Sequence, residues 1–401
     1  MLIRKKCLSC KSTSLTEIIN LGLHSFADRF VPKKKINKKD PSFPLILDFC
    51  IKCKFIQSKI ITNPKQRYLE IDYSYTSSNS KYSRKHWNEF ANYLEKKFYL
   101  KNKKILEIGS NDGYLCELLN KKGANTVGVD ASIFMTKLSK KRKIKSINLI
   151  FNFKESNKIK KKYKKFDIII ANNVFNHSDQ PSDFLKGVYN LLNNDGIYIF
   201  EQPNFAIGAT SLKFDQIYHE HVSYFTSKNI ESILKNNKFK LINIKQNHYH
   251  GGSLRSVAVK KNSNKYPIEY NRSNFKKYDK IYNLLFFKNM MEKIDKKRFS
   301  FMKKIYLLKR KGYVICGIGA GAKANTFLTY YNLNNKLLKF VTDASKFKQN
   351  KFTPLTRIQI KDDKAIKNYK KIACIILSWN ISNLVIKKIK KLNKNIKILY
   401  T

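Results

Sequence analysis

The feature that most constrains this sequence is a short apolar stretch closed by a turn between two glycines. Residues 104–109 read Lys-Ile-Leu-Glu-Ile-Gly and predict a buried strand. Residues 110–113 predict a tight turn, and residues 114–119 predict the start of a helix. A strand, a glycine turn and a helix in this order form one unit of a parallel sheet, in which glycine lets the backbone approach a ligand. The middle of the chain is therefore expected to be an α/β domain.

Three more apolar runs, at residues 125–130, 166–171 and 196–200, continue the pattern. They predict a doubly wound, Rossmann-like domain, which we place at residues 67–265. Its second strand ends in Asp130, which can accept both hydroxyls of a ribose. The turn lacks the Gly-x-Gly-x-x-Gly that holds a pyrophosphate, so we expect S-adenosylmethionine (SAM) rather than a dinucleotide. The expected cofactor residues are Glu107, Gly109, Ser110, Asn111, Asp112, Gly113, Asp130, Asn172 and Asn173.

Four of the seven cysteines form two Cys-x-x-Cys pairs near the N-terminus. They are Cys7, Cys10, Cys50 and Cys53. Each short loop puts two thiolates on one side of an ion, and two loops complete a tetrahedral shell. We therefore predict a structural Zn²⁺ in a small module at residues 1–66. Two pairs in one chain make redox chemistry the weaker alternative.

The last third of the chain predicts a second, smaller Rossmann-like domain at residues 266–401. Amphipathic linking helices are expected at residues 271–310, before a strand, a glycine-rich turn and a helix at 312–326. Further strands are expected at 337–343 and 373–379. By itself the glycine run suggests either a dinucleotide site or a tight turn without a ligand, because such turns favour glycine in both cases.

Composition limits the class of protein. The 401 residues favour two or three domains. No apolar run reaches the roughly 20 residues that cross a bilayer, and the start of the chain lacks the apolar core of a signal peptide, so a cytoplasmic enzyme is expected. The formal charge of +53 comes from 81 basic and 28 acidic residues. Because lysine is spread over the whole chain, we attribute this charge to solvated helix faces rather than to nucleic-acid binding.

Two segments concentrate side chains suited to proton transfer. Residues 171–179 follow a predicted strand and contain His177. Residues 214–225 contain Tyr218-His-Glu-His221. The His-x-His spacing lacks the helical i, i+4 geometry of zinc proteases, whereas a histidine beside a glutamate suits general acid–base catalysis. We therefore expect an active site here.

The ordered motifs of the whole chain resemble the nucleotide-sugar C-methyltransferases of deoxysugar biosynthesis. The matching segments are the four cysteines and residues 21–23, 72–78, 107–113, 172–177, 217–225, 250–255, 319–326 and 378–380. The resemblance implies SAM-dependent methylation of C3 of a TDP-linked 4-keto-deoxysugar. A ketone acidifies its α-proton, so a base can remove that proton and leave an enolate that accepts the methyl group.

The resemblance also implies roles for individual residues. His221 would be the base, with Glu220 and Tyr218 orienting the sugar or the base and His177 contacting the substrate. One tyrosine, either Tyr73 or Tyr75, would complete the catalytic site. The C-terminal domain would hold the nucleotide-sugar, with Lys323 and glycine amides at its pyrophosphate. The residues expected to bind this substrate are His250, Arg255, Gly319, Lys323 and Asn325.

Two other functions remain open from the residues alone. A zinc-ribbon RNA methyltransferase would use the basic surface, but it has little use for the cluster at residues 218–221. A non-catalytic nucleotide-sugar-binding protein would not need intact His177, Glu220 and His221. The chain departs from the family pattern at Gly321 and Asn350, which bears on the nucleotide contacts rather than on methyl transfer. A monomer or weak homo-oligomer without a membrane span is expected.

Overall fold

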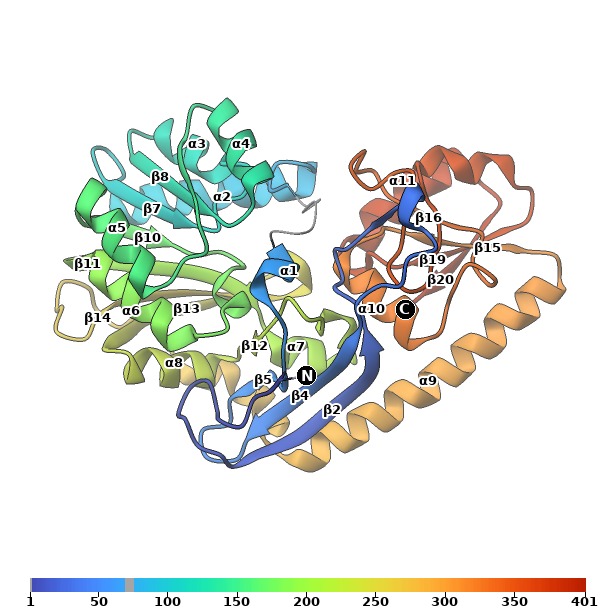
Figure 1. The fold of residues 1–401 in the computed structure, drawn as a ribbon, viewed down its shortest axis with the longest axis horizontal. Helices are drawn as coiled ribbons and strands as arrows, with labels where there is room; N and C mark the ends of the chain where they lie inside the picture. The colour runs from blue at the N-terminus through green and yellow to red at the C-terminus, as the bar shows by residue number, and fades with distance from the viewer. Residues whose placement is uncertain (1, 69–75) are drawn as a thin grey trace.

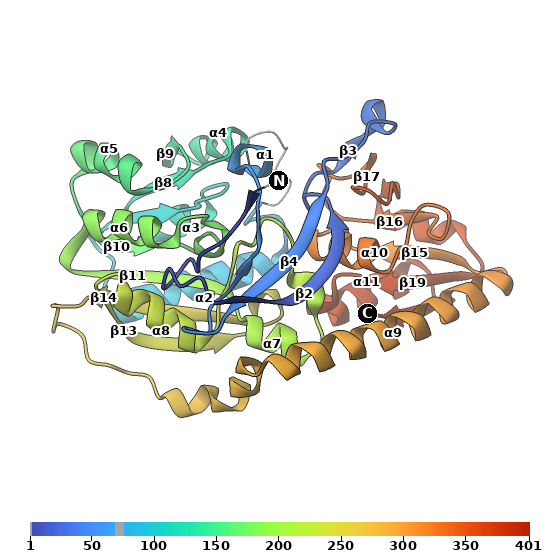
Figure 2. The same ribbon diagram turned by 60° about the horizontal axis from the view of Figure 1, so that its bottom comes forward.

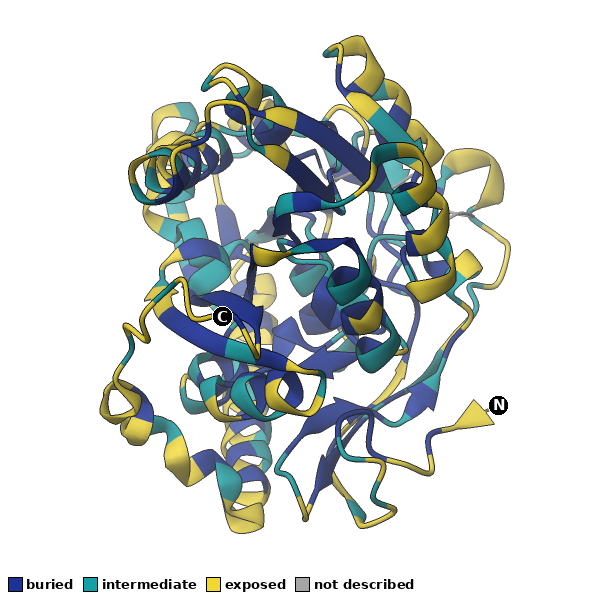
Figure 3. Ribbon diagram, turned by 90° about the vertical axis from the view of Figure 1, so that its left-hand side faces the viewer, coloured by how far each residue is buried: buried dark blue, intermediate teal, exposed yellow. Residues whose placement is uncertain are grey.

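The computed structural model describes residues 2–68 and 76–401. They form a central α/β lobe and a C-terminal α/β lobe, with an N-terminal antiparallel sheet and a long helix running between and below them (Figure 1). Strands are largely buried, and the outward faces of the helices are exposed (Figure 3). Within the described residues, no helix has both the length and the apolar character needed to cross a membrane.

The central lobe is built on a seven-stranded sheet with the order β13-β14-β11-β10-β7-β8-β9. Strands β7 to β11 pair in parallel, whereas β13 and β14 are antiparallel to their neighbours. Residues 105–108 are all buried, because helices cover both faces of a parallel sheet. This confirms the predicted α/β class. The strands are β7 (Lys104–Ile108), β8 (Asn125–Asp130), β9 (Lys145–Asn148), β10 (Phe166–Ile170), β11 (Leu192–Pro203), β13 (Phe239–Asn247) and β14 (Ser253–Lys260).

Helices cover both faces of this sheet. One face packs against α2 and α3 in a core that includes Ile105 and Ile168, and the other packs against α5, α6 and α8 around Leu106 and Ile169. The side chain of Ser80 caps α2 by accepting a hydrogen bond from the Ser83 amide. The helices are α2 (Lys81–Phe98), α3 (Tyr114–Asn120), α4 (Ile133–Lys141), α5 (Phe153–Tyr163), α6 (Pro181–Leu191), α7 (Phe205–Thr210) and α8 (Ser227–Asn236), with 3₁₀ turns at Phe175–His177, Phe214–Gln216 and Tyr249–Gly251.

The Cys-rich N-terminal module is an antiparallel sheet with the order β12-β5-β4-β2. Strand β12 belongs to the central lobe and pairs Ser223 with Gln57, so the two parts share one sheet. An arm beyond β2 reaches the C-terminal lobe, where β3 pairs with β17 (Lys351–Phe352). The elements of the module are β1 (Leu2–Ile3), β2 (Leu15–His24), β3 (Val31–Pro32), a 3₁₀ turn (Lys33–Lys35), β4 (Phe43–Cys50), β5 (Ile56–Ser58), β6 (Ile60–Ile61) and α1 (Pro64–Tyr68), and the strand that joins its sheet from the central lobe is β12 (Ser223–Tyr224).

The C-terminal lobe has an all-parallel sheet with the order β18-β16-β15-β19-β20. Its core includes residues of β2 and β4, which pass between the two lobes (Figure 2). The linking segment is a 3₁₀ stretch (Arg272–Tyr282) followed by one long helix, α9 (Leu284–Arg310). The other elements are β15 (Val314–Ile318), α10 (Ala322–Tyr330), β16 (Phe340–Thr342), β17 (Lys351–Phe352), β18 (Ile360–Lys361), 3₁₀ turns (Asp363–Asn368 and Trp379–Ile381), β19 (Ile372–Ile376), α11 (Ser382–Leu392) and β20 (Ile396–Tyr400).

Candidate active site

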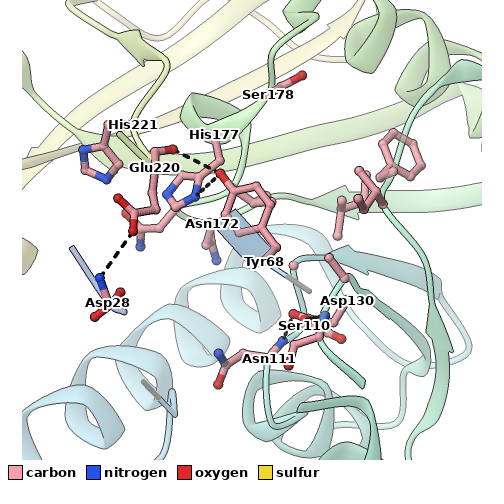
Figure 4. Close-up of a pocket in the computed structure, with 18 of the residues that line it drawn as sticks. Asp28, Tyr68, Ser110, Asn111, Asp130, Asn172, His177, Ser178, Glu220 and His221 are labelled. Atoms are coloured by element: carbon pink, nitrogen blue, oxygen red, sulfur yellow. Dashed lines mark hydrogen bonds between the residues drawn. The ribbon is translucent and has the colours of Figure 1, made fainter. Parts of the chain in front are cut away.

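A cavity of about 710 Å³ lies where the three parts of the chain meet. Its central-lobe wall is formed by the carboxyl ends of the parallel strands β7, β8, β10 and β11, the usual ligand-binding edge of such a sheet. The C-terminal lobe contributes the start of α10, and the N-terminal module contributes Asp28 and Tyr68. Figure 4 shows part of this lining.

The cofactor end of the cavity is organised by Asp130 at the end of β8. One oxygen of its carboxyl accepts a hydrogen bond from the Asn111 amide and the other from the Ser132 amide, both at 2.8 Å. Gly109, with φ +75°, closes β7, and a Cβ there would lie 2.9 Å from Val174. Burial raises the pKa of Asp130 to about 6. Backbone amides therefore fix an acid at the place where a nucleoside ribose would lie.

Polar atoms at this end lack partners among the described residues. They are Ser110 Oγ, Asn172 Nδ2 and Asn173 Oδ1, and all three side chains line the cavity. A buried polar group without a hydrogen bond costs about 1–3 kcal/mol, so these atoms fit a bound polar ligand. Together with Asp130 they suit the ribose and the amino acid part of SAM.

The structure brings most of the predicted cofactor residues to the cavity, but not Asp112 or Gly113. The Asp112 carboxyl instead accepts hydrogen bonds from the Ser77 and Ser78 hydroxyls. Gly113, with φ +75°, begins α3, and a Cβ there would collide with Ser139. These two residues shape the turn. In the sequence alone, a residue that a turn requires looks the same as a residue that contacts a ligand, so the two roles could not be distinguished there.

Asp130→Asn is expected to weaken SAM binding by about 10–100-fold, because a hydrogen bond to a charged group contributes about 1.5–3 kcal/mol. Isothermal titration calorimetry with SAM measures the effect. Asp167→Asn is the matched control. The Asp167 carboxyl also accepts a hydrogen bond from a backbone amide, that of Lys104 at the start of β7, but it lies outside this cavity. Equal affinities of the two variants would contradict the assignment.

The opposite end of the cavity holds His177, Tyr218, Glu220 and His221. His221 Nδ1 lies 3.0 Å from the Gln216 carbonyl oxygen, which only accepts, so this nitrogen carries the proton. Burial lowers the pKa of His221 well below its ordinary value. The imidazole is therefore neutral, and its Nε2 has a free lone pair without a partner among the described residues.

The two histidines of the His-x-His pair, His219 and His221, point in opposite directions. His219 is buried and points away from the cavity, with Nε2 donating to the carbonyl oxygens of His24 (3.2 Å) and Phe43 (3.1 Å). Its ring also packs edge-on against Phe26 and Phe43. His219 thus anchors the central lobe to the N-terminal module, while His221 faces the cavity.

Two residues of the N-terminal module join the site without having been predicted. The Asp28 amide donates to Glu220 Oε1 at 3.3 Å, and the Asp28 side chain lines the cavity. Burial, followed by the nearby Asp28 charge, raises the pKa of Glu220 to about 8. The Tyr68 hydroxyl lies 3.3 Å from His177 Nδ1 and 3.2 Å from the Glu220 carbonyl oxygen (Figure 4). Because its pKa is about 8, the Glu220 carboxyl is protonated at neutral pH and can donate a hydrogen bond.

The two tyrosines expected to complete the site, Tyr73 and Tyr75, lie outside the described residues. Tyr68 stands only a few residues earlier, at the end of α1. No local motif marked Tyr68 or Asp28. Each meets its partners in the cavity only through contacts between segments more than a hundred residues apart in sequence.

The buried histidines give a pH-dependent prediction for stability. Burial lowers the pKa of His24 to about 4 from 6.5. Since the folded pKa lies below the unfolded one, the unfolded state gains the proton first, and stability present above pH 6.5 is lost as the pH falls toward 4. Between pH 7.5 and pH 5, wild type should lose about 2 kcal/mol more free energy of unfolding than His24→Gln.

Urea unfolding at the two pH values measures this difference. The control is His248→Gln, which removes an exposed imidazole and should follow the wild type. If His24→Gln shows the same pH dependence as the wild type, then His24 does not stay neutral in the folded protein.

The predicted substrate residues divide into two groups. His250 and Lys323 line the cavity, and Lys323 Nζ donates to the His250 carbonyl oxygen at 2.6 Å. Burial lowers the pKa of Lys323 to about 8. The other three do not line the cavity. Arg255 pairs with the buried Glu201, a Cβ on Gly319 would collide with Ser378, and the Asn325 side chain donates to the Ala27 carbonyl.

Arg255, Gly319 and Asn325 therefore stabilise the structure around the cavity and do not line its interior. The C-terminal lobe presents other groups instead. The described residues that line the cavity from this lobe are Gly321, Ala322, Lys323, Ala324, Lys348, Leu377, Ser378 and Asn380. Two of the three lysines that line the cavity, Lys323 and Lys348, lie on this wall, which makes it the more positively charged side.

The four paired cysteines form a separate cluster, in which the sulfur atoms all lie within 4.8 Å of one another. Cys7 and Cys53 Sγ are 3.5 Å apart, and Cys10 and Cys50 Sγ are 3.6 Å apart. Sulfurs around a tetrahedral zinc, each about 2.3 Å from the ion, lie roughly 3.8 Å apart, so this arrangement fits zinc. None of the four lines the cavity, which makes the zinc structural.

Comparison with known proteins gives three family matches in order along the chain. They are a zinc binding domain at residues 7–68, a methyltransferase domain at 80–244 and a C-methyltransferase C-terminal domain at 248–399. The C-methyltransferase NovU of Streptomyces niveus is 21% identical over 393 residues, which is 97% of this chain and 93% of that protein. The ubiquinone biosynthesis O-methyltransferase of Coxiella burnetii (strain RSA 493) is 24% identical over 169 residues, which is 39% of this chain and 72% of that protein.

Among solved structures, magnesium protoporphyrin IX methyltransferase (ChlM) from Synechocystis PCC 6803 with bound SAH matches 44% of this chain and 83% of its own, at 17% identity and a TM-score of 0.36. The three family matches reproduce the order of N-terminal module, central lobe and C-terminal lobe, and NovU shares nearly the whole chain. The chain belongs to the SAM-dependent C-methyltransferases that join a zinc-binding domain and a methyltransferase domain to a C-methyltransferase C-terminal domain.

Proposed function

We propose that this enzyme methylates the carbon α to the ketone, C3, of a nucleotide-linked 4-keto-deoxysugar. The observation that carries the proposal is the neutral His221, whose Nε2 lone pair is open to the cavity that also contains the SAM-binding edge. The motif resemblance to nucleotide-sugar C-methyltransferases and the similarity to the C-methyltransferase NovU support the same reaction.

The proton step follows from these side chains. His221 Nε2 takes the proton from the α-carbon, and the electrons of the broken C–H bond move onto the ketone oxygen. The protonated Glu220 donates a hydrogen bond to that oxygen, which is worth most where water is excluded. The negative enolate stabilises the new imidazolium beside it.

When bound, SAM would supply an electrophilic methyl group: the enolate carbon would form the new C–C bond as the methyl–sulfur bond breaks, with S-adenosylhomocysteine as the leaving group. The ketone is restored, and the proton held by His221 passes to solvent when the product leaves. The residues proposed to hold SAM are Glu107, Gly109, Ser110, Asn111, Asp130, Asn172 and Asn173.

The positively charged wall of the C-terminal lobe is the proposed site of the nucleotide diphosphate. Lys323 and Lys348 both line it, and the amides at the start of α10 lie beside them. Anions bind well to the first amides of a helix. The proposed domain division is residues 1–66 for zinc, 67–265 for SAM and 266–401 for the nucleotide-sugar.

The test is a panel of nucleotide-linked sugars incubated with SAM. TDP-linked 4-keto-6-deoxysugars should gain the mass of one methyl group, and NMR of the product should place it on the carbon next to the ketone. The matching 4-hydroxy sugars should not react, because they have no acidic α-proton. Methylation on oxygen, or methylation of the 4-hydroxy sugars, would refute the proposal.

A further inference from the structure

The Tyr68 hydroxyl occupies a position that no part of the proposed mechanism uses. Tyr68 is the last residue of α1, and it lines the cavity. Its ring stacks on His177 with the centroids 5.9 Å apart, and the Arg67 guanidinium lies over it at 5.2 Å. The hydroxyl oxygen lies 3.3 Å from His177 Nδ1 and 3.2 Å from the Glu220 carbonyl oxygen.

Counting hydrogens determines which atom donates in each bond. A tyrosine hydroxyl has one proton, and a backbone carbonyl oxygen can only accept. The Tyr68 proton therefore goes to the Glu220 carbonyl, and the Tyr68 oxygen accepts from His177 Nδ1. Burial lowers the pKa of His177 to about 3, so the ring is neutral and has a single proton. With that proton on Nδ1, His177 Nε2 has a free lone pair.

The neighbouring imidazole has the same arrangement. His221 Nδ1 donates to the Gln216 carbonyl, and the two ring centroids are 5.1 Å apart. His177 lines the cavity, and its Nε2 has no hydrogen-bond partner among the described residues. Two imidazoles thus stand side by side, each with its proton on Nδ1, although only His221 is needed as the base.

We propose that Tyr68 is a positioning residue that holds the proton of His177 on Nδ1, so that His177 Nε2 accepts a hydrogen bond from a hydroxyl group of the sugar. His177 then helps to bind the sugar in the cavity beside His221. This consequence for the substrate rests on the proposed function, whereas the tautomer of His177 does not. It also defines the substrate class further, as keto-sugars that have a hydroxyl within reach of His177.

The tautomer is tested without substrate or SAM, by long-range ¹H–¹⁵N NMR of the histidine rings in the full chain. His177→Gln identifies the His177 signals by their loss. In the wild type, His177 should show a protonated Nδ1 and a bare Nε2. Tyr68→Phe should shift the ring toward the Nε2-protonated form, whereas Tyr198→Phe, which removes a buried hydroxyl that has no hydrogen bond to His177, should not. An Nε2-protonated His177 in the wild type would overturn the proposal.

The functional consequence is tested by α-proton exchange of a TDP-linked 4-keto-6-deoxyhexose in D₂O without SAM. Tyr68→Phe should raise KM about 2–10-fold, the worth of one neutral hydrogen bond, and leave kcat within twofold. In the His177→Gln background, the same change should alter KM less than twofold. A full Tyr68 effect in that background, or none in the wild type, refutes the proposal. If the wild type exchanges no keto-sugar, the proposed function fails, and the NMR result still decides the tautomer.

Discussion

His221→Gln is expected to lower kcat for methyl transfer by about 10²–10⁴-fold, the usual contribution of a placed general base. His221 Nδ1 donates to the Gln216 carbonyl at 3.0 Å, which leaves Nε2 to receive the proton. Glutamine keeps a similar size and a donor but has no nitrogen lone pair that can take a proton. The binding of SAM, measured by calorimetry, should remain unchanged, because the cofactor edge lies at the other end of the cavity.

His219→Gln is the matched control for this prediction. His219 is the other histidine of the His-x-His pair, but it donates to the His24 and Phe43 carbonyls and does not line the cavity. Its substitution should lower thermal stability and leave kcat of the folded protein within about threefold of wild type, because no reacting atom loses a partner. If the two variants lose activity equally, His221 has no special role in proton transfer.

Removal of the zinc is expected to have the largest effect on stability. Structural zinc contributes about 10–16 kcal/mol to the folding of small zinc-binding peptides. In this chain the loss of zinc should destabilise the central lobe as well, because Cys50 ends β4 and the adjacent β5 pairs with β12 of that lobe. We expect Cys53→Ser to lower the melting temperature by more than about 10 °C, since 1 kcal/mol corresponds to roughly 2–4 °C in a domain of 150–250 residues.

Metal analysis and calorimetry test this together. The wild type and Cys374→Ala should each contain one zinc per chain and melt at a lower temperature after chelation, because Cys374 lies in the C-terminal sheet. Cys53→Ser should contain less zinc and respond little to a chelator. A wild type whose melting is insensitive to complete zinc removal would rule out a structural role for the metal.

The fold was predictable wherever one local pattern sufficed. Uninterrupted apolar runs marked β7 and β8, because strands of a parallel sheet are covered on both faces. The two Cys-x-x-Cys knuckles marked the zinc cluster. The pairing of β12 with β5 had no such signal, since a strand of two residues is too short to show a period.

The candidate site was predictable only in part, because the type of a residue does not determine which way its side chain points. His219 and His221 are both plausible catalysts in sequence, yet only His221 faces the cavity. Arg255 was expected from the resemblance to bind the substrate, but its guanidinium pairs with the buried Glu201. Asp28 and Tyr68 reach the site only through tertiary contacts, so no pattern in the sequence could select them.

Part of the high positive charge of the chain lies at the cavity, and the rest lies on the solvent-exposed surface. Most lysines lie on exposed faces, as the even spread in sequence suggested. Lys154, Lys323 and Lys348 are different, because all three line the cavity, and the last two belong to the C-terminal lobe. Two of the three lysines at the cavity therefore belong to its C-terminal wall, where the nucleotide diphosphate is proposed to bind.

If His221 deprotonates a keto-sugar in the cavity, the enzyme should exchange the α-proton of that sugar with solvent in the absence of SAM. The wild-type enzyme is incubated in D₂O with a TDP-linked 4-keto-6-deoxyhexose, and the sugar is analysed by mass spectrometry and NMR. We expect deuterium at the carbon next to the ketone, formed at least about 100-fold faster than with His221→Gln. Deuterium incorporation at the same rate by both proteins would contradict this role of His221.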